Sequence, residues 1–144
     1  MNVMNVDFSE TWVPIDTLLI SAATTEQNSG YVSLAGYNRV AIIVHALIVT
    51  TTLDIDIEIA TAVGGTNAVT LKSAAQLLAA DDGDIIVFDI RPDELSNPAN
   101  TSVNEFSWLN VELTPSGAAT VSVIVLGMSA YRPGTQTLWS QAIS

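Results

Sequence analysis

Cysteine is absent from the 144 residues of this chain, which excludes disulfide bonds, thiolate metal sites and cysteine nucleophiles. Cations are scarce: Arg39, Lys72, Arg91 and Arg132 stand against fifteen acidic residues, and the formal net charge is -11. Proteins that bind nucleic acid or an anionic membrane surface need clustered Lys and Arg side chains. We therefore expect neither kind of partner.

Histidine is represented by His45 alone, within an apolar segment. A single histidine without cysteine cannot build a zinc site. No Gly-x-Ser-x-Gly element is present, and Gly64-Gly65-Thr66 lacks the lysine of a phosphate-binding loop. We expect no enzymatic activity, no metal and no cofactor, and we interpret His45 as a buried or interface residue with one hydrogen-bond partner.

The sequence has no pattern typical of a signal peptide or of a membrane-spanning helix. Residues 1–7 have neither the basic region nor the apolar run of a signal peptide. The longest apolar run, residues 40–49, is about half of what a membrane-spanning helix needs. We expect synthesis in a cytoplasm.

The most informative segment is residues 53–60, where Leu, Ile, Ile and Ile alternate with Asp, Asp, Glu and Ala. Successive strand side chains point to opposite faces, so this pattern predicts a half-buried antiparallel strand. Hydrophobic residues make up 49 % of the chain, charged residues 13 %, and mean hydropathy is +0.40. A single all-β domain follows, with an apolar core and some outer surface covered by partners.

Turn signals divide the chain into about eight short strands, as expected for an antiparallel β-sandwich of jelly-roll type. We expect the sandwich at 17–133, between flexible arms at 1–16 and 134–144. The predicted strands are 17–24, 31–34, 40–49, 53–61, 68–71, 84–90, 107–114 and 119–127. Residues 53–61 are interpreted as the hairpin partner of 40–49. Residues 73–80 suit a strand or a helix, and 91–95 suits one helical turn with Pro in it.

Three predicted strands are apolar on both faces: residues 40–49, 84–90 and 121–126. A sandwich strand normally has one wet face, so the second face needs a cover, either a loop of the same chain or another subunit. We favour a subunit because no long apolar loop is available. In residues 40–49 we place the interface on Ala41, Ile43, His45 and Leu47, and the core on the alternate residues.

Three groups of acidic or aromatic residues are candidate ligand sites. Asp54, Asp56 and Glu58 are too far apart along a strand to share one ion, so a solvated face is favoured. Asp81-Asp82-Gly83-Asp84 lacks the calcium-loop pattern and is interpreted as a β-turn. Trp12, Trp108 and Trp139 could stack on sugars, although packing is the default for such residues.

Residues 36–133, about two thirds of the chain, carry a pattern that resembles a known family. The matching segments are Gly36-Tyr37-Asn38-Arg39, Thr52-Leu53-Asp54-Ile55, Glu58-Ile59-Ala60-Thr61-Ala62, Gly65-Thr66, Lys72, Asp81-Asp82-Gly83, residues 90–95, Leu113-Thr114-Pro115, residues 121–127 and Tyr131-Arg132-Pro133. They resemble small jelly-roll virion proteins of tailed bacteriophages, which decorate or cement capsids, often as trimers. The resemblance implies a homotrimer bound to the major capsid protein, and it brings no catalytic residues.

Strong negative charge is awkward beside packaged DNA, so we expect the outer capsid surface of the virion after synthesis in the host cytoplasm. The arms carry Phe8, Trp12, Leu138, Trp139 and Ile143, which we expect to contact the capsid or a neighbouring subunit; the alternative is that they fold back on their own domain. A competing hypothesis is a carbohydrate- or receptor-binding β-sandwich of a phage tail or fibre. An exposed aromatic cluster with nearby Asp and Asn residues would favour it. A jelly-roll enzyme ranks last, because the metal-binding histidines are absent.

Overall fold

The computed structural model describes residues 11–95 and 106–129. Strands dominate these ranges, which confirms the all-β prediction. The elements are β1 (Trp12–Ala23), β2 (Gln27–Asn28), β3 (Val32–Ser33), β4 (Tyr37–Val49), β5 (Thr52–Ala60), β6 (Val69–Ser73), β7 (Leu77–Leu78), η1 (Ala79–Asp81), β8 (Ile85–Ile90), η2 (Pro92–Leu95), β9 (Trp108–Pro115) and β10 (Ala119–Ser129).

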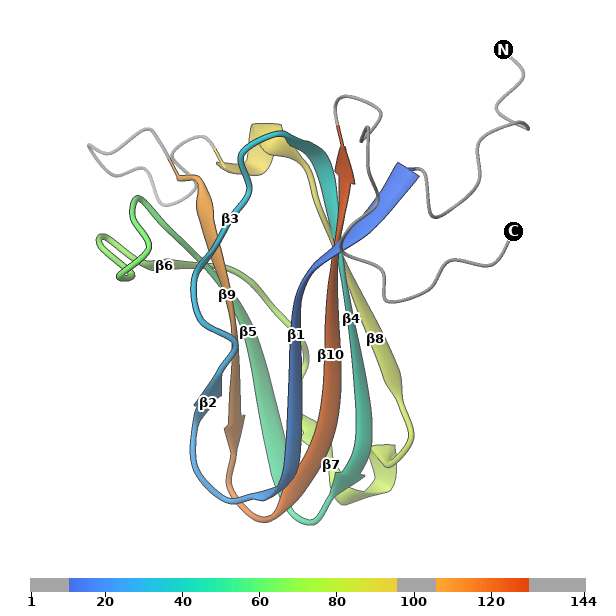
Figure 1. Ribbon diagram of the computed structural model, residues 1–144. Helices are drawn as coiled ribbons and strands as arrows, with labels where there is room; N and C mark the ends of the chain where they lie inside the picture. Colours follow the sequence, from blue (N-terminus) through green and yellow to red (C-terminus); the bar gives the residue numbers. More distant parts are fainter. Residues whose placement is uncertain (1–10, 96–105, 130–144) are drawn as a thin grey trace.

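Two antiparallel sheets face each other in a sandwich (Figure 1). Sheet A has the strand order β1-β10-β4-β8, and sheet B has the order β2-β9-β5-β6, with β3 also on β9 and β7 also on β5. If β2 with β3, and β6 with β7, are each counted as one interrupted strand, the orders become 1-8-3-6 and 2-7-4-5. These are the two interlocked Greek keys of a jelly roll. The predicted sandwich of jelly-roll type is therefore confirmed.

The core lies between the sheets and is built from alternate residues of the long strands. In β5, the four residues Leu53, Ile55, Ile57 and Ile59 are buried while the acidic residues between them remain partly exposed. The facing strands contribute Val40, Ile42, Val44 and Ala46 of β4, Leu109, Val111 and Leu113 of β9, and Val121, Val123 and Val125 of β10. The alternation read from residues 53–60 thus sets which side of sheet B faces the core.

The predicted hairpin between residues 40–49 and 53–61 is wrong. β4 pairs with β10 and β8 in sheet A, whereas β5 pairs with β9, β6 and β7 in sheet B. The chain between them crosses from one sheet to the other. Both strands carry a strongly apolar stripe, and packing one stripe against the other across the sandwich removes both from water.

A β-bulge changes the predicted faces of β4. Ala46 lies opposite Val121 and Ile48 opposite Thr120, which leaves Leu47 without a partner in the ladder. The extra residue reverses the alternation beyond it. Ile48 is consequently 49 % exposed and Val49 only 1 %, the opposite of the strict alternation predicted for this strand.

Other boundaries differ in smaller ways. β1 begins at Trp12 rather than at residue 17, so residues 12–16 belong to sheet A and not to an arm. The ambiguous residues 73–80 contain the end of β6, the two-residue β7 and most of η1. The helical turn expected at 91–95 is confirmed as η2. In the parts of the chain that the structure describes, no helix is long and apolar enough to cross a membrane.

Candidate interaction surface

The three strands that the sequence showed to be apolar on both faces are neighbours in sheet A, in the order β10, β4 and β8. Their outward side chains therefore form one surface, which we call the apolar face. Edge strand β1 adds two outward residues to this surface. The members of the apolar face are Thr17, Leu19, Ala41, Ile43, His45, Leu47, Ile48, Ile85, Val87, Ser122 and Ile124.

The strand registers arrange the middle of the apolar face in two rows. The first row contains Thr17, Ile124, Ile43 and Val87, one residue from each strand. The second row contains Leu19, Ser122, His45 and Ile85. Directly opposite residues on neighbouring strands have Cβ atoms about 4.5–5.5 Å apart, so each row is continuous. Neither row contains an acidic residue, a lysine or an arginine.

Several large apolar side chains of the apolar face are exposed. Leu19 is 74 % exposed, Ile85 62 %, Val87 61 % and Ile124 40 %. Single exposed apolar residues are common, but contiguous apolar patches are typical of sites where a protein meets a partner. Full burial of one Val, Leu or Ile side chain contributes about 1.5–3 kcal/mol. A partner that covers this face therefore gains several such contributions.

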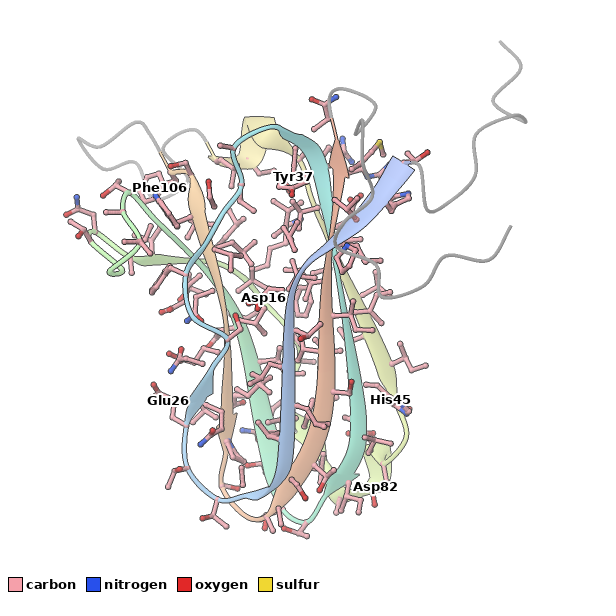
Figure 2. The ribbon with its side chains drawn as sticks, in the orientation of Figure 1. Asp16, Glu26, Tyr37, His45, Asp82 and Phe106 are labelled. Carbon is pink, nitrogen blue, oxygen red and sulfur yellow. The ribbon has the colours of Figure 1, made fainter. Side chains whose placement is uncertain are left out.

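The structure places all four residues of the predicted subunit interface on the apolar face. Ala41, Ile43 and His45 are half-buried by their neighbours, and Leu47 is exposed at the bulge. Figure 2 shows His45 on the outer side of sheet A, while Glu26 lies on the opposite side of the molecule. His45 makes no hydrogen bond within residues 11–95 and 106–129, so the partner expected for it is not found in this part of the chain.

Of the residues predicted to touch the capsid, Trp12 is the one that the structure describes. It is the first residue of β1, lies opposite Met128 of β10 and is half-buried. Trp12 therefore belongs to sheet A. Phe8, Leu138, Trp139 and Ile143 lie outside the described residues.

An ion pair borders the apolar face where β4 begins. Arg39 donates to both carboxylate oxygens of Asp89, from Nε at 2.7 Å and from Nη2 at 2.5 Å. The hydrogen bond from Arg39 holds the pKa of Asp89 below its usual range. The side chains of Arg39 and Asp89 are 48 % and 37 % exposed, so water weakens the pair, which contributes little to stability and acts as a polar rim.

The outer face of sheet B has the opposite character, with Asp54, Asp56 and Glu58 on β5 and Glu112 on β9. Asp56 lies directly opposite Glu112 in the β5–β9 ladder. Burial raises the pKa of Glu112, and the nearby carboxylates of Glu58, Glu26 and Asp56 raise it further. The molecule thus has one apolar outer face and one acidic outer face.

A polar network at the edge of the acidic face was not anticipated from the sequence. Asn110 is 1 % exposed, because the segment from β2 to β3 covers it. Its Nδ2 donates to Asn28 Oδ1 at 2.6 Å and to Glu58 Oε2 at 3.0 Å, and its Oδ1 accepts from the Gly30 amide at 3.0 Å. Tyr31 also donates to Glu58 Oε2, and burial raises the tyrosine pKa to about 12. These bonds hold the β2–β3 segment on sheet B.

Carboxylates of the acidic turn before β8 accept hydrogen bonds from backbone amides. Asp81 Oδ2 accepts from the Leu78 amide at 2.7 Å, and Asp82 Oδ1 accepts from the Val49 amide at 2.6 Å. Gly83 adopts a positive φ of 89°, as the turn interpretation requires. Among residues 11–95 and 106–129, no group of three or more His, Cys, Asp or Glu side chains is arranged to hold a metal ion.

The aromatic side chains in the described ranges are buried or half-buried. Phe88 and Phe106 are buried, and Trp12, Trp108, Tyr31 and Tyr37 are half-buried. The exposed aromatic cluster that would favour a sugar-binding surface is therefore not found in this part of the chain.

Comparison with known proteins gives structural matches only. No family model and no curated protein matches the chain. A Bacillus endospore appendage protein, from a family of disulfide-linked pili, matches at TM-score 0.49 and 12 % identity over 84 % of this chain and 90 % of the other. The SPBc2 prophage-derived protein YomS matches at TM-score 0.41 and 13 % identity over 80 % and 96 %.

A third match is the Clostridium thermocellum xylanase 10B with its CBM22-1 and GH10 modules, solved with xylohexaose. Its TM-score is 0.36 and its identity 12 %, over 85 % of this chain and 27 % of that one. At these scores the three matches carry no argument about function.

Proposed function

We propose that this protein is a structural virion protein that decorates or cements the outside of a bacteriophage capsid through protein–protein contacts. The observation that carries the proposal is the apolar face, a continuous exposed surface across β10, β4 and β8. Burying such a surface against protein is favourable, and its polar rim confines the contact. The bacteriophage capsid as the setting rests on the sequence resemblance.

Self-association is the first part of the proposal. We assign the apolar face, centred on Ala41, Ile43, His45 and Leu47, to contacts between copies in a homotrimer. His45 at the centre suits an interface, because a neighbouring copy can supply the hydrogen-bond partner that the described residues do not provide. The number three rests on the resemblance, in which trimers are common.

Attachment to the shell is the second part. The proposed partner is the major capsid protein, contacted by Phe8 and Trp12 near the beginning of the chain and by Leu138, Trp139 and Ile143 near its end. An outside position suits the net charge of -11 and the acidic outer face of sheet B, since both are repelled by packaged DNA. The proposal includes no catalysis, no cofactor, and no nucleic-acid or membrane partner.

Mixing the purified protein with phage shells that lack it tests the proposal. We expect the protein to sediment with the shells at a fixed number of copies per shell. Removal of the residues after Pro133 is expected to weaken shell binding while leaving the melting temperature of the free protein unchanged. Binding to host glycans with no binding to shells would instead support the receptor-binding alternative.

An Ile43→Asp variant tests the assembly. A charge in the middle of the apolar face is unfavourable when a neighbouring copy buries it, so we expect light scattering to show a lower mass than for the unchanged protein. Ala75→Asp is the matched control, because it adds the same charge at an exposed position between β6 and β7. A monomeric mass for the unchanged protein, or an equal loss of mass in the control, contradicts the assigned interface.

A further inference from the structure

Strand β8 is an unusually regular sheet edge. It pairs with β4 from Val40–Ile90 to His45–Ile85 without a register shift, and among residues 11–95 and 106–129 no strand pairs with its other side (Figure 1). The opposite edge of sheet A, β1, is broken by two register shifts. In sheet B, β2 and β3 have two residues each, and β6 pairs with a shift. Short or irregular edges resist pairing with another chain, and β8 lacks that protection.

The backbone directions within β8 follow from the hydrogen bonds of Ala46. The Ala46 amide donates to the Asp84 carbonyl at 2.9 Å, and the Ala46 carbonyl accepts from the Gly83 amide at 2.7 Å, so both backbone groups of Ala46 point toward β8. Bonded and non-bonded pairs alternate along an antiparallel ladder. Ile86, Phe88 and Ile90 therefore bond to β4, while Ile85, Val87 and Asp89 direct their amides and carbonyls away from the sheet.

Lys72 closes one end of this edge. Its ammonium group donates to the outward carbonyl of Asp89 and forms an ion pair with Glu94 at 2.8 Å. The outward backbone groups of Ile85 and Val87 make no hydrogen bond with any residue that the structure describes, and their side chains are 62 % and 61 % exposed on the apolar face. A strand that pairs with this edge therefore contacts one short segment that has both free backbone groups and exposed apolar side chains.

Charge identifies a second copy of this chain as the occupant. The acidic residues Asp81, Asp82 and Asp84 lie at the beginning of β8. At its end, Asp89 pairs with Arg39 and Glu94 pairs with Lys72, while Arg91 has no ion pair among the described residues. Antiparallel pairing of two identical strands around a two-fold axis brings the acidic end of each strand beside the Arg91 end of the other. Opposite charges then meet at both ends of the contact, so the edge is complementary to itself.

We propose that β8 pairs antiparallel with β8 of a second copy, with Ile85 of each chain opposite Val87 of the other. This register uses the free backbone groups and leaves the Lys72–Asp89 contact intact. A two-fold contact uses the same patch on both copies, whereas a closed threefold ring joins two different patches. The β8 contact, which rests on the proposed function for the trimer, links copies that belong to different trimers.

Sedimentation of the full chain and its variants tests the inference. The unchanged protein is expected to form a closed hexamer, in which each of the three β8 strands of one trimer pairs with a β8 strand of the other. Val87→Pro removes an amide that faces away from β4, so it keeps the ladder to β4, and the expected species is a trimer. Val87→Thr, which keeps the amide and the branched side chain, is the matched control and should remain hexameric. Circular dichroism checks that each variant is folded.

Arg91→Glu tests the same contact without touching the backbone of β8. Repulsion from the acidic turn of the other copy is expected to shift this variant from hexamer to trimer. Ile43→Asp is expected to leave a dimer held by β8. If the unchanged protein is a dimer, and this dimer is lost in Val87→Pro but kept in Ile43→Asp, the β8 contact is supported and the trimer is refuted. An unchanged protein that is trimeric or monomeric, or an assembly that survives both Val87→Pro and Arg91→Glu, overturns the β8 contact.

Discussion

Replacing Asn110 with alanine removes the centre of the polar network that holds the β2–β3 segment on sheet B. The bonds to Asn28 and from Gly30 are neutral and contribute about 1 kcal/mol each. The bond to the Glu58 carboxylate is charge-assisted and contributes about 1.5–3 kcal/mol. Because Glu58 keeps its bond from Tyr31, the lower end applies, and the expected loss in the free energy of unfolding is about 3–4 kcal/mol.

Urea unfolding followed by tryptophan fluorescence measures this loss, with all variants at one protein concentration because assembly adds to apparent stability. Thr114→Ala is the matched control: Thr114 lies on the same face of β9, is exposed, and has no side-chain hydrogen bond among the described residues. We expect it to change stability by less than about 0.5 kcal/mol.

Amide exchange gives a second, local readout of the same substitution. In Asn110→Ala the Gly30 amide loses its acceptor, and the neighbouring bond from the Ser29 amide to the Val111 carbonyl loses support. Exchange at Gly30 and Ser29 should therefore accelerate, and in Thr114→Ala it should not. A stability loss below about 1 kcal/mol together with unchanged exchange would refute the role given to Asn110.

Two further predictions concern packing and charge. A Cβ atom at Gly127 would lie 2.4 Å from Cδ1 of the Tyr37 ring, so Gly127→Ala should lower the free energy of unfolding in urea by about 1–3 kcal/mol; a neutral result would show that the ring moves freely. Because folding raises the pKa of Glu112, the folded protein binds its proton more tightly and stability falls as pH rises through that pKa. Glu112→Gln should therefore raise the melting temperature at pH 7, with a gain that shrinks on acidification. A gain independent of pH contradicts a pKa of Glu112 raised by burial and by Glu58, Glu26 and Asp56.

The strand pattern of the sequence was sufficient to predict the class of fold. Alternation over residues 53–60 predicts a half-buried strand, and the structure buries Leu53, Ile55, Ile57 and Ile59 as expected. Side-chain direction in a strand depends on local backbone geometry, so the sequence carries this information directly. The helical turn at η2 is predictable for the same reason, since Pro92 favours the first turn of a helix.

Strand pairing could not be predicted in the same way. β4 and β5 follow each other in the chain and looked like a hairpin, yet they lie in different sheets. Partner choice depends on which apolar stripes can cover each other, and this involves strands far apart in sequence, such as β4 with β10. The bulge at Leu47 has a similar origin, because it adjusts the register of β4 against β10 and exposes Ile48.

The apolar face illustrates both kinds of information. The sequence by itself determined that three strands have a second apolar side and that residues such as Ile43 need a cover. Only the tertiary structure decided that these strands are adjacent, so that Val87, Ile43 and Ile124 join in one row. It also decided that Asn110 is buried beneath the β2–β3 segment and that β8 is an edge. Adjacency of this kind depends on long-range pairing of strands, which local sequence patterns do not specify.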